Sequence, residues 1–550
     1  MAGVMFVGDI TKVDIGTSSF EKLITEKSLY IDKSRFIEHF LNETPSAQLI
    51  TRQRRIGKSL NMDMLRCFLT DSADHRDLFE NLYIKSSPVW EKANSAPVFL
   101  FSFKNLNLET YRDVISDMIN EYANEYLPAC TGALQTSYRN WFAERGLRSD
   151  GLLLLTKIVC AATGKKSYIF VDEYDKLLLD IARAARYSEV RDYFTQFYSA
   201  GLKDNPYLKK GLLTGVMRLS HEGMFSGLNN IKTYDVFKDA VYNDDYGITE
   251  NEMSELARVA GFDLAEARRW YNGIKVQGIP IYNTFGVMSM IDGGNEFDCY
   301  WNRSGTMDII VSLLNPQRKR TLLSLLEFGS TAQVSVESRV SPQTLFSEKT
   351  DDMFYSLLIQ SGYLSLEKQS GTKAAVAVPN VELQEVWSRF LLRQLVPDQS
   401  ALDGLFTNIA DPALLARDIA GFLTPLLEGL SYFDLPEPPG ADGRKRTPEV
   451  YYHIFLYGVL RMGIDNLGCT RLLSNRESGG GRYDVMAERE NEAVVFELKT
   501  AAEGENLDAL AQAALRQIIG SRYGADTGKP VVAVGLAFRG KNCRAAARRL

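Results

Sequence analysis

Short apolar runs alternate with longer amphipathic stretches over the first 230 residues. Apolar residues recur every three or four positions in Lys58–Leu69 and Tyr111–Tyr126, which predicts helices. Four runs rich in β-branched and aromatic residues predict strands: Ala47–Thr51, Pro97–Phe103, Ser167–Asp172 and Gly211–Val216. Strands separated by helices imply a parallel sheet that is covered on both faces. The sequence therefore predicts a three-layer α/β domain over residues 1–230.

The pattern becomes mainly helical between residues 231 and 380. Thr249 and Glu252 have the spacing of a capping box ahead of the apolar positions of Met253–Val259. We interpret this segment as a helical lid or extension of the first domain. A third domain is predicted over residues 381–550, with a linker at Leu435–Pro448 that is rich in proline, glycine and basic residues.

The last domain contains both the helical and the strand pattern of apolar residues. Its pattern predicts, in order, a helix, two strands, a helix and a strand: Glu449–Gly463, Tyr483–Glu488, Ala493–Lys499, Leu507–Ile519 and Pro530–Phe538. The fold class is therefore α/β at both ends of the chain, and we expect a mixed sheet in the last domain.

Composition narrows the class of protein. The chain has 550 residues and a net charge of −6, so any nucleic-acid site is confined to a local basic surface. Its six cysteines form no CxxC pair, which indicates a reducing compartment. No apolar run approaches the roughly 18 residues of a membrane span, and the N-terminus lacks the pattern of a signal peptide. We expect a cytoplasmic protein that does not enter the membrane.

The tripeptide Gly57-Lys58-Ser59 joins a predicted strand to a predicted helix, where backbone N–H groups and the helix dipole can hold phosphates. Lys58 would reach the β- and γ-phosphates of ATP, and Ser59 would bind Mg²⁺. Arg52 stands where the motif usually has its first glycine. Together with Arg54 and Arg55, it is expected to bring positive charge near the phosphates.

The strand Tyr168–Val171 ends in two acids, Asp172 and Glu173. Asp172 would approach Mg²⁺ at the edge of the sheet, while Glu173 would polarise the attacking water. Thr214 and Arg218, at the end of another strand, are candidates to contact the γ-phosphate. Alternatively, Asp172 and Glu173 mark a strand that leaves the core through a polar loop. Arg218 is alternatively a surface arginine.

Together these segments resemble the bacterial AAA-ATPase-like proteins that carry a C-terminal nuclease domain of the PD-(D/E)xK superfamily. The resemblance covers nearly the whole chain and implies ATP and Mg²⁺ as cofactors. Gln53 and Ile56 depart from the family's usual proline and phenylalanine. The motifs that carry the resemblance are Tyr30–Ser34, Thr51–Ser59, Val171–Asp175, Ser226–Asn230, Trp270–Gly273 and Ser361–Leu364. Asp32 and Lys33 either frame the nucleotide site or form a surface ion pair, and Trp270–Gly273 is interpreted as a turn that supports the fold.

Two carboxylates and a lysine occupy a predicted hairpin in the last domain. If Arg489–Glu492 form its loop, the numbers of cross-strand partners add up to 981, which places Asp484 opposite Glu497. Opposed side chains share a face with Cβ atoms about 4.5–5.5 Å apart, close enough to bind one divalent cation. Lys499 lies on the same face because side chains alternate along a strand. A charged solvent-exposed face is the alternative interpretation.

This spacing resembles the PD-(D/E)xK nuclease core. The resemblance implies that Asp484 and Glu497 bind Mg²⁺ and that Lys499 positions the water or the phosphate. It also implies that Glu449 lies near the metal and that Gln517 orients the acids or contacts nucleic acid. Tyr483 replaces the usual proline.

Basic residues surround the predicted hairpin. Arg476, Gly479–Arg482 and the arginines of the last twelve residues are candidates for phosphate contacts, and a solvated basic tail explains the last ten residues equally well. His453 is interpreted as a packed histidine rather than a ligand. Nothing resembles a motif that reads base sequence.

We expect an ATP-dependent or ATP-gated nuclease that acts on nucleic acid, with DNA as the expected substrate. One alternative is a nucleotide-switched module that binds DNA or a protein with an inactive nuclease fold. Another is a homo-oligomeric ATPase that remodels a partner, with Arg54, Arg55 or Arg218 completing a neighbouring subunit's site.

Overall fold

The computed structural model describes residues 6–144, 147–219, 230–238, 241–276, 278–301, 305–326, 330–393, 405–429, 449–462, 467–474 and 477–550. The chain divides into two compact units. The first contains Met1–Leu313 and Gln333–Glu382, and the second contains Leu314–Ala332 and Leu383–Leu550. The predicted linker and most of Ser226–Asn230 lie outside the described residues.

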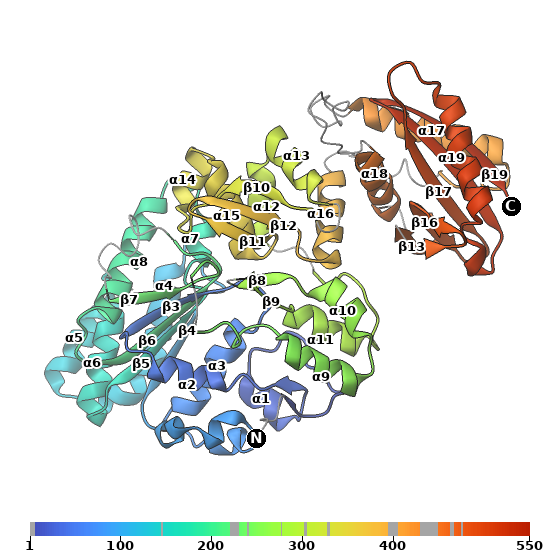
Figure 1. Cartoon of the computed structure of the whole chain (residues 1–550). Helices are drawn as coiled ribbons and strands as arrows, with labels where there is room; N and C mark the ends of the chain where they lie inside the picture. The colour runs from blue at the N-terminus through green and yellow to red at the C-terminus, as the bar shows by residue number, and fades with distance from the viewer. Residues whose placement is uncertain are drawn as a thin grey trace. The chain divides into compact units, whose positions relative to one another are not determined.

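A five-stranded parallel sheet forms the centre of the first unit, in the order β4-β5-β6-β3-β7 (Figure 1). Its strands are β3 (Ala47–Thr51), β4 (Val98–Ser102), β5 (Ser167–Asp172), β6 (Leu208–Gly215) and β7 (Ile231–Tyr234). The predicted parallel sheet is confirmed. Strand β7 lies just past residue 230, so the sheet extends beyond the predicted end of the first domain.

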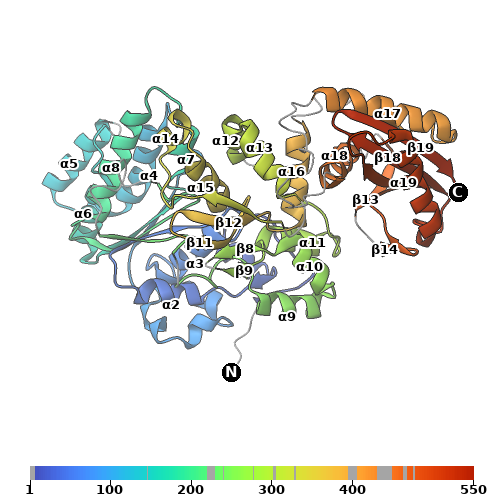
Figure 2. The same ribbon diagram turned by 45° about the horizontal axis from the view of Figure 1, so that its top comes forward.

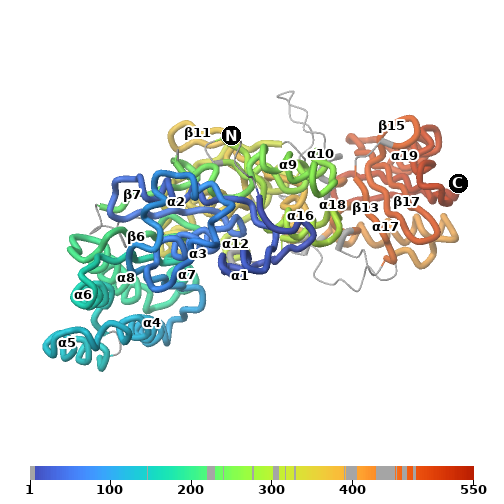
Figure 3. The backbone as a smooth tube through the Cα atoms, turned by 90° about the horizontal axis from the view of Figure 1, so that it is seen from below, coloured from blue at the N-terminus to red at the C-terminus, as the bar shows by residue number. Residues whose placement is uncertain are grey.

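Helices cover both faces of this sheet. Phe40 on α2 packs against Phe170, with ring centroids 5.8 Å apart, while Leu202 on α8 approaches Gly211 from the opposite face. Figure 3 shows α1, α2 and α3 apart from α4, α5, α6 and α8. The first layer contains α1 (Phe20–Thr25), α2 (Arg35–Asn42) and α3 (Lys58–Leu69), and the second contains α4 (Tyr111–Tyr126), α6 (Gly151–Thr163) and α8 (Tyr187–Leu202). The three-layer prediction is therefore confirmed.

Smaller elements complete this region of the chain. They are β1 (Phe6–Val7), β2 (Tyr30–Ile31), α5 (Gly132–Ala143), α7 (Lys176–Asp180) and the 3₁₀ helices Arg76–Phe79, Tyr83–Ser86, Pro88–Lys92 and Leu127–Ala129. Strands β1 and β2 pair in antiparallel fashion.

The segment after β7 is mainly helical but also contains short strands (Figure 2). Its helices are α9 (Glu250–Ala260), α10 (Leu264–Tyr271), α11 (Thr284–Asp292), α12 (Gly305–Leu313), α13 (Pro316–Ser324), α14 (Pro342–Ser347) and α15 (Asp351–Ser361). Its strands are β8 (Ile274–Val276), β9 (Ile279–Ile281), β10 (Ala332–Ser335), β11 (Ser365–Ser370) and β12 (Lys373–Ala377). The capping box of Thr249 and Glu252 at the start of α9 is confirmed.

Helix α16 (Val381–Arg393) follows β12 along the chain. Its first two residues belong to the first unit, and the remainder belongs to the second. The helix therefore continues through the division between the units.

A mixed sheet in the order β13-β16-β17-β18-β19 forms the centre of the last domain. Strands β17 and β18 are parallel and the other pairs are antiparallel, as predicted for a mixed sheet. The strands are β13 (Cys469–Ser474), β16 (Val485–Arg489), β17 (Ala493–Thr500), β18 (Val531–Arg539) and β19 (Asn542–Arg549). The strand β13 was not predicted.

Apolar side chains of β17 alternate between two cores. Val494, Phe496 and Leu498 pack with α17 (Pro412–Gly429) and α18 (Glu449–Met462). Val495 packs on the other face with α19 (Leu507–Ser521). The odd-numbered positions of β17 therefore face α19. A small hairpin of β14 (Glu477–Ser478) and β15 (Gly481–Arg482) and a 3₁₀ helix at Ala525–Thr527 complete the domain.

The interpretation of the last ten residues as a solvated tail is wrong. They form β19, which pairs with β18 over eight residues from Asn542 to Arg549. Cys543 and Ala546 are buried on opposite faces of the sheet, in two different cores, while Arg544 and Arg548 are exposed. Among the helices that the structure describes, none combines the length and apolar character needed to cross a membrane.

Candidate functional site

A cavity of about 830 Å³ lies beside the predicted phosphate loop in the first unit. The N-terminal segment 13–19, the loop and the start of α3 form part of its wall. The end of β5 and Gly247, Phe285 and Met288 from the segment after β7 form the rest. The cavity thus combines a polar end at Lys58 with an apolar end, as a nucleotide requires.

Lys58 is the buried cation of this site. Its Nζ donates to the carbonyl oxygens of Arg52 at 3.1 Å and Gln53 at 2.6 Å. Burial lowers the pKa of Lys58 to about 8, although the nearby carboxylates of Asp172, Asp175 and Glu173 act in the opposite direction. The ammonium is therefore held by the loop itself, where phosphate oxygens can replace the carbonyl acceptors.

Asp172 brings together three of the predicted residues at the end of β5. The hydroxyls of Ser59 and Thr214 donate to its two carboxylate oxygens at 2.5 and 2.6 Å. Ser59 and Asp172 both line the cavity, whereas Thr214 is fully buried behind them. A hydroxyl and a carboxylate are hard oxygen donors, so this pair fits Mg²⁺.

Glu173 also lines the cavity, and its backbone has a positive φ of 56°. Such a conformation is uncommon for a non-glycine residue and is often found at functional sites. Burial, followed by the neighbouring Asp172, raises the pKa of Glu173. A carboxylate with a raised pKa beside the phosphate loop suits the predicted role of orienting water.

Asp175 also lies at this site, although it is not among the site residues predicted from the sequence. Its buried Oδ2 accepts N–H bonds from Val216 at 3.0 Å and Met217 at 2.6 Å, and burial raises its pKa to about 6. It also lines the cavity close to Lys58. Its position in the Val171–Asp175 motif was the available signal.

The expectation that Arg52 adds charge near the phosphates is wrong. Its side chain is fully buried, and Nη1 donates to the carbonyl oxygens of Thr51 at 2.9 Å and Tyr234 at 3.3 Å. The guanidinium also lies 5.6 Å from the ring centre of Tyr246. Arg52 therefore joins β3 to the end of β7 and does not line the cavity.

The other arginines occupy different positions around the loop. Arg54 lines the cavity. Arg55 lines it too, but its guanidinium lies over Phe285 and Trp301 and donates to the carbonyl oxygen of Tyr300 at 3.3 Å. Arg218 forms an ion pair of 2.6 Å with buried Asp235 and is not part of the cavity wall.

Two backbone N–H groups from the segment after β7 hold the loop. Phe285 donates to the carbonyl oxygen of Arg55 at 3.2 Å, and Gly247 donates to that of Ile56 at 3.0 Å. In addition, Gly362 lies so close to Gln53 that a Cβ there would be 2.8 Å from Gln53 Cγ. The motif Ser361–Leu364 therefore packs against the phosphate loop.

The second candidate site is the β16–β17 hairpin. Val485 pairs with Phe496 and Met486 with Val495, so the predicted register, in which partners add up to 981, is confirmed. Asp484 immediately precedes β16, and its Oδ2 accepts the backbone N–H of Leu498 at 2.7 Å. Lys499 Nζ lies 3.6 Å from Glu497 Oε1.

These three side chains are only partly accessible. Glu497 has 3 % of its surface exposed, and burial raises the pKa of Asp484, opposed by the Leu498 N–H, His453 and Lys499. One buried and one half-buried carboxylate beside one ammonium form a set of hard oxygen donors with excess negative charge, which fits Mg²⁺. Within the described part of the chain, no group of three His, Cys, Asp or Glu side chains forms a metal cluster.

The other predicted nuclease residues lie on helices. Glu449 is the first residue of α18, and its side chain lies outside the described set, as does Arg476. Gln517 is half-buried on α19, and the structure records no bond between it and the acids among the described residues. A Cβ at Gly535, the partner of Glu497 on β18, would lie 2.2 Å from the carbonyl oxygen of Ala511. Glycine there lets α19 approach the sheet beside Glu497.

His453 contacts the acidic hairpin more directly than the sequence suggests. Its Nε2 lies 3.0 Å from the carbonyl oxygen of Asp484 and 2.9 Å from Ser474 Oγ. Because a carbonyl only accepts, Nε2 carries the proton in the first contact. His453 therefore fixes the backbone of Asp484 to α18, one turn after Glu449, and positions the acid without being a ligand.

Comparisons with known proteins agree with the two domain families that the sequence resembles. A family model described as a predicted AAA-ATPase matches residues 14–225, and a model of the PD-(D/E)XK nuclease superfamily matches residues 447–547. The chain is 27% identical over 501 residues to the "Uncharacterized protein in vnfD 5'region" of Azotobacter chroococcum mcd 1. That alignment covers 89% of each chain.

Proposed function

We propose that the chain is an ATP-gated, metal-dependent nuclease, because residues 14–225 match a model of predicted AAA-ATPases and residues 447–547 match a model of the PD-(D/E)XK nuclease superfamily. Its substrate is nucleic acid. The observation that carries the proposal is the hairpin on which Asp484 accepts the N–H of Leu498, the residue next to Glu497, while Lys499 lies 3.6 Å from Glu497.

The nuclease residues have distinct parts in phosphodiester hydrolysis. A divalent cation bound by Asp484 and Glu497 would supply Lewis-acid chemistry at the phosphate. The Leu498 N–H orients the Asp484 carboxylate, and His453 fixes its backbone. Lys499 offsets negative charge on the scissile phosphate and orients it for attack. Glu449 and Gln517 stay candidates for this site.

The residues of the proposed nucleotide site also have distinct roles. Lys58 binds the phosphates by exchanging the carbonyls of Arg52 and Gln53 for phosphate oxygens. Ser59 and Asp172 would hold Mg²⁺, and Glu173 orients water for hydrolysis. Arg54 is the remaining arginine that can meet a phosphate, because Arg55 and Arg218 already contact other groups.

The backbone of Tyr300 connects the phosphate loop to the start of α16, and this connection supports gating by ATP. Its carbonyl oxygen accepts from Arg55 of the loop, and its N–H donates to Glu382 Oε1 at 2.9 Å. Glu382 lies in the first turn of α16, the helix that continues into the second unit. A change in the loop on nucleotide binding can therefore reach the start of α16 through two hydrogen bonds.

Replacing Glu382 by alanine tests this connection. We expect the variant to bind ATP and to retain its nuclease activity without ATP, but to lose at least about 80% of the ATP effect, because Tyr300 no longer has its acceptor. Glu382→Gln keeps an acceptor oxygen and should restore most of the effect. The comparison uses cleavage rates with and without ATP, and an undiminished response in Glu382→Ala would contradict the connection.

The proposed activity is tested with the full chain, Mg²⁺ and a panel of single-stranded, linear and circular DNA and RNA. We expect cleavage that requires Mg²⁺ and changes about tenfold or more when ATP is added. Cleavage of no substrate in the panel would contradict the nuclease proposal. A cleavage rate that does not change when ATP is added would contradict only the proposed gating.

A nucleotide-switched binding module remains the alternative to test. It predicts tight binding of nucleic acid without cleavage. Crystals soaked in Mn²⁺ distinguish the two, because the nuclease requires an ion at Asp484 and Glu497, whereas the binding module does not.

A further inference from the structure

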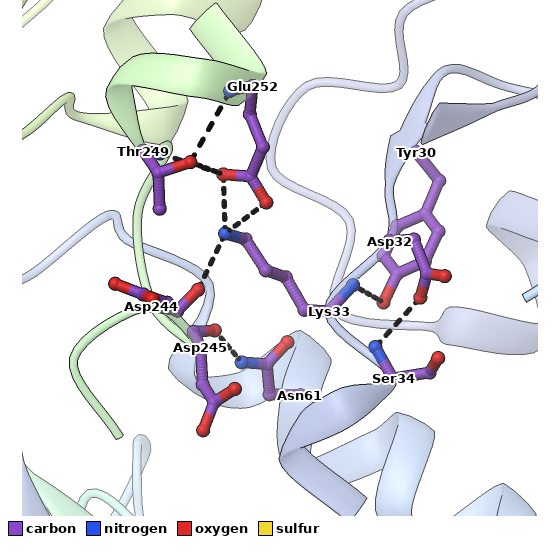
Figure 4. Close-up of polar contacts among 9 residues, drawn as sticks. All are labelled: Tyr30, Asp32, Lys33, Ser34, Asn61, Asp244, Asp245, Thr249 and Glu252. Carbon is purple, nitrogen blue, oxygen red and sulfur yellow. Dashed lines mark hydrogen bonds and ion pairs between the residues drawn. The ribbon is translucent and has the colours of Figure 1, made fainter. Parts of the chain in front are cut away.

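The motif Tyr30–Ser34 contains the best-buried lysine–glutamate ion pair among the described residues of the first unit. Lys33 Nζ donates to both carboxylate oxygens of Glu252, at 2.8 and 2.7 Å, and the two side chains are only 9 % and 15 % exposed (Figure 4). The interpretation of Asp32 and Lys33 as a surface ion pair is therefore wrong. Asp32 instead accepts the backbone N–H groups of Ser34 and Tyr83.

Lys33 makes a third bond, to the carbonyl oxygen of Asp244 at 2.8 Å. The next carbonyl, that of Asp245, accepts from Asn61 Nδ2 at 2.7 Å, as Figure 4 shows. Asn61 lies on α3, one turn after Lys58. Two side chains thus hold consecutive carbonyl groups of the segment Asp244–Ile248.

The same segment holds the phosphate loop. Its Gly247 donates to the carbonyl oxygen of Ile56, and Ile248 lines the cavity. Gly247 has a φ of 73°, and a Cβ there would lie 3.0 Å from the carbonyl oxygen of Tyr282, so this position requires glycine. The ion pair, the segment and the loop therefore form one continuous set of contacts.

A fixed carbonyl also fixes the next N–H group. The C=O and N–H of a trans peptide point in opposite directions, so the bond from Gly247 to the Ile56 carbonyl determines where the Gly57 N–H points. Backbone N–H groups at this position cradle phosphates in such loops. Arg52 replaces the first glycine of the motif, so the loop depends on contacts from outside its own sequence.

We propose that Lys33 is a positioning residue for the triphosphate: with Glu252 and Asn61 it holds Asp244–Ile248 so that the Gly57 N–H is oriented toward the phosphates. The inference rests on the proposed function of the cavity as a nucleotide site. It goes beyond that function because it assigns part of the phosphate affinity to Lys33, which lines the cavity but whose ammonium is already bonded to Glu252 and to the carbonyl oxygen of Asp244.

The test replaces both members of the ion pair, in the double variant Lys33→Met and Glu252→Gln. Glutamine retains the capping box with Thr249, and the double change leaves no unpaired buried charge. We expect affinity for ATP and for inorganic triphosphate to fall about tenfold or more alike, because the phosphate contacts are misaligned. Isothermal titration measures both ligands, and thermal melting reports stability.

Three further variants make the result specific. Lys275→Met with Glu367→Gln removes another half-buried lysine–glutamate pair of the first unit and should change affinity less than about threefold. Asn61→Leu removes the bond from α3 to the same segment. It should lower the affinity for both ATP and inorganic triphosphate. Lys33→Arg keeps a cationic donor and should restore affinity to within about threefold of the parent.

The outcomes separate this inference from the function on which it rests. Parental affinity in both the Lys33–Glu252 and Asn61 variants would overturn the inference alone. An equal loss in the Lys275–Glu367 control would also overturn it, because it would show a general effect of stability. A parent chain that binds neither ATP nor triphosphate would overturn the nucleotide site and this inference together.

Discussion

Replacing Lys58 by alanine is expected to abolish nucleotide binding while the first domain stays folded. The ammonium is buried, and its present acceptors are two loop carbonyls that phosphate oxygens would replace. Loss of a buried charged hydrogen bond costs about 3 kcal/mol or more, which corresponds to about a 100-fold loss of affinity. Isothermal titration with ATP measures this change.

The matched control is Lys85→Ala, which removes a lysine that pairs with Glu80 at the surface and does not line the cavity. It should leave ATP affinity within about twofold of the parent, because exposed ion pairs contribute little. Binding by Lys58→Ala at the parental affinity would show that the cavity does not hold the phosphates in the way we propose.

The second large effect is expected from Glu497→Gln in the last domain. Glutamine preserves the volume of this buried side chain but removes its charge, so the pair with Asp484 can no longer hold a divalent cation. We expect cleavage to fall about 1,000-fold or more, equivalent to about 4 kcal/mol in activation free energy. ATP affinity should not change, since Glu497 is far from the phosphate loop in sequence and belongs to the other unit.

Glu503→Gln supplies the control for this variant. Glu503 is an exposed carboxylate just beyond β17. The Glu503→Gln variant should therefore cleave nucleic acid at the parental rate. The assay compares initial rates on one DNA and one RNA substrate at saturating Mg²⁺. If Glu497→Gln cleaves as fast as the parent, the activity belongs to another site or to a contaminant.

Features set by neighbouring residues could be predicted from the sequence. The capping box needs only Thr249 and Glu252, and the hairpin register follows from a four-residue loop and the alternation of strand residues. The strand β19 was missed because alanine and arginine give weak strand signals, and its pairing with β18 compensates for them.

The environments of the arginines could not be predicted, because their partners lie far along the chain. The second acceptor of Arg52, the carbonyl oxygen of Tyr234, is 182 residues away, and the acceptor of Arg55 is 245 residues away. A basic cluster beside Gly57-Lys58-Ser59 suggests phosphate binding, but only tertiary contacts decide which guanidinium groups face the cavity. The contacts of His453 and Asp175 could not be predicted for the same reason, since their partners Asp484 and Val216 come from other parts of the chain.

The dependence of the phosphate loop on distant residues also affects the order in which the chain can be assembled during translation. Tyr234, Gly247 and Phe285 supply contacts to a loop that leaves the ribosome about 230 residues before the last of them. At about 5–20 residues per second, this interval is on the order of 10–50 s. For most of that time Arg52 lacks its bond to Tyr234 and the carbonyl of Ile56 lacks its bond to Gly247, and the carbonyl of Arg55 waits for Phe285 until the end. Nucleotide can therefore become a ligand of the nascent chain only late in its synthesis, after the segment that follows β7 has emerged.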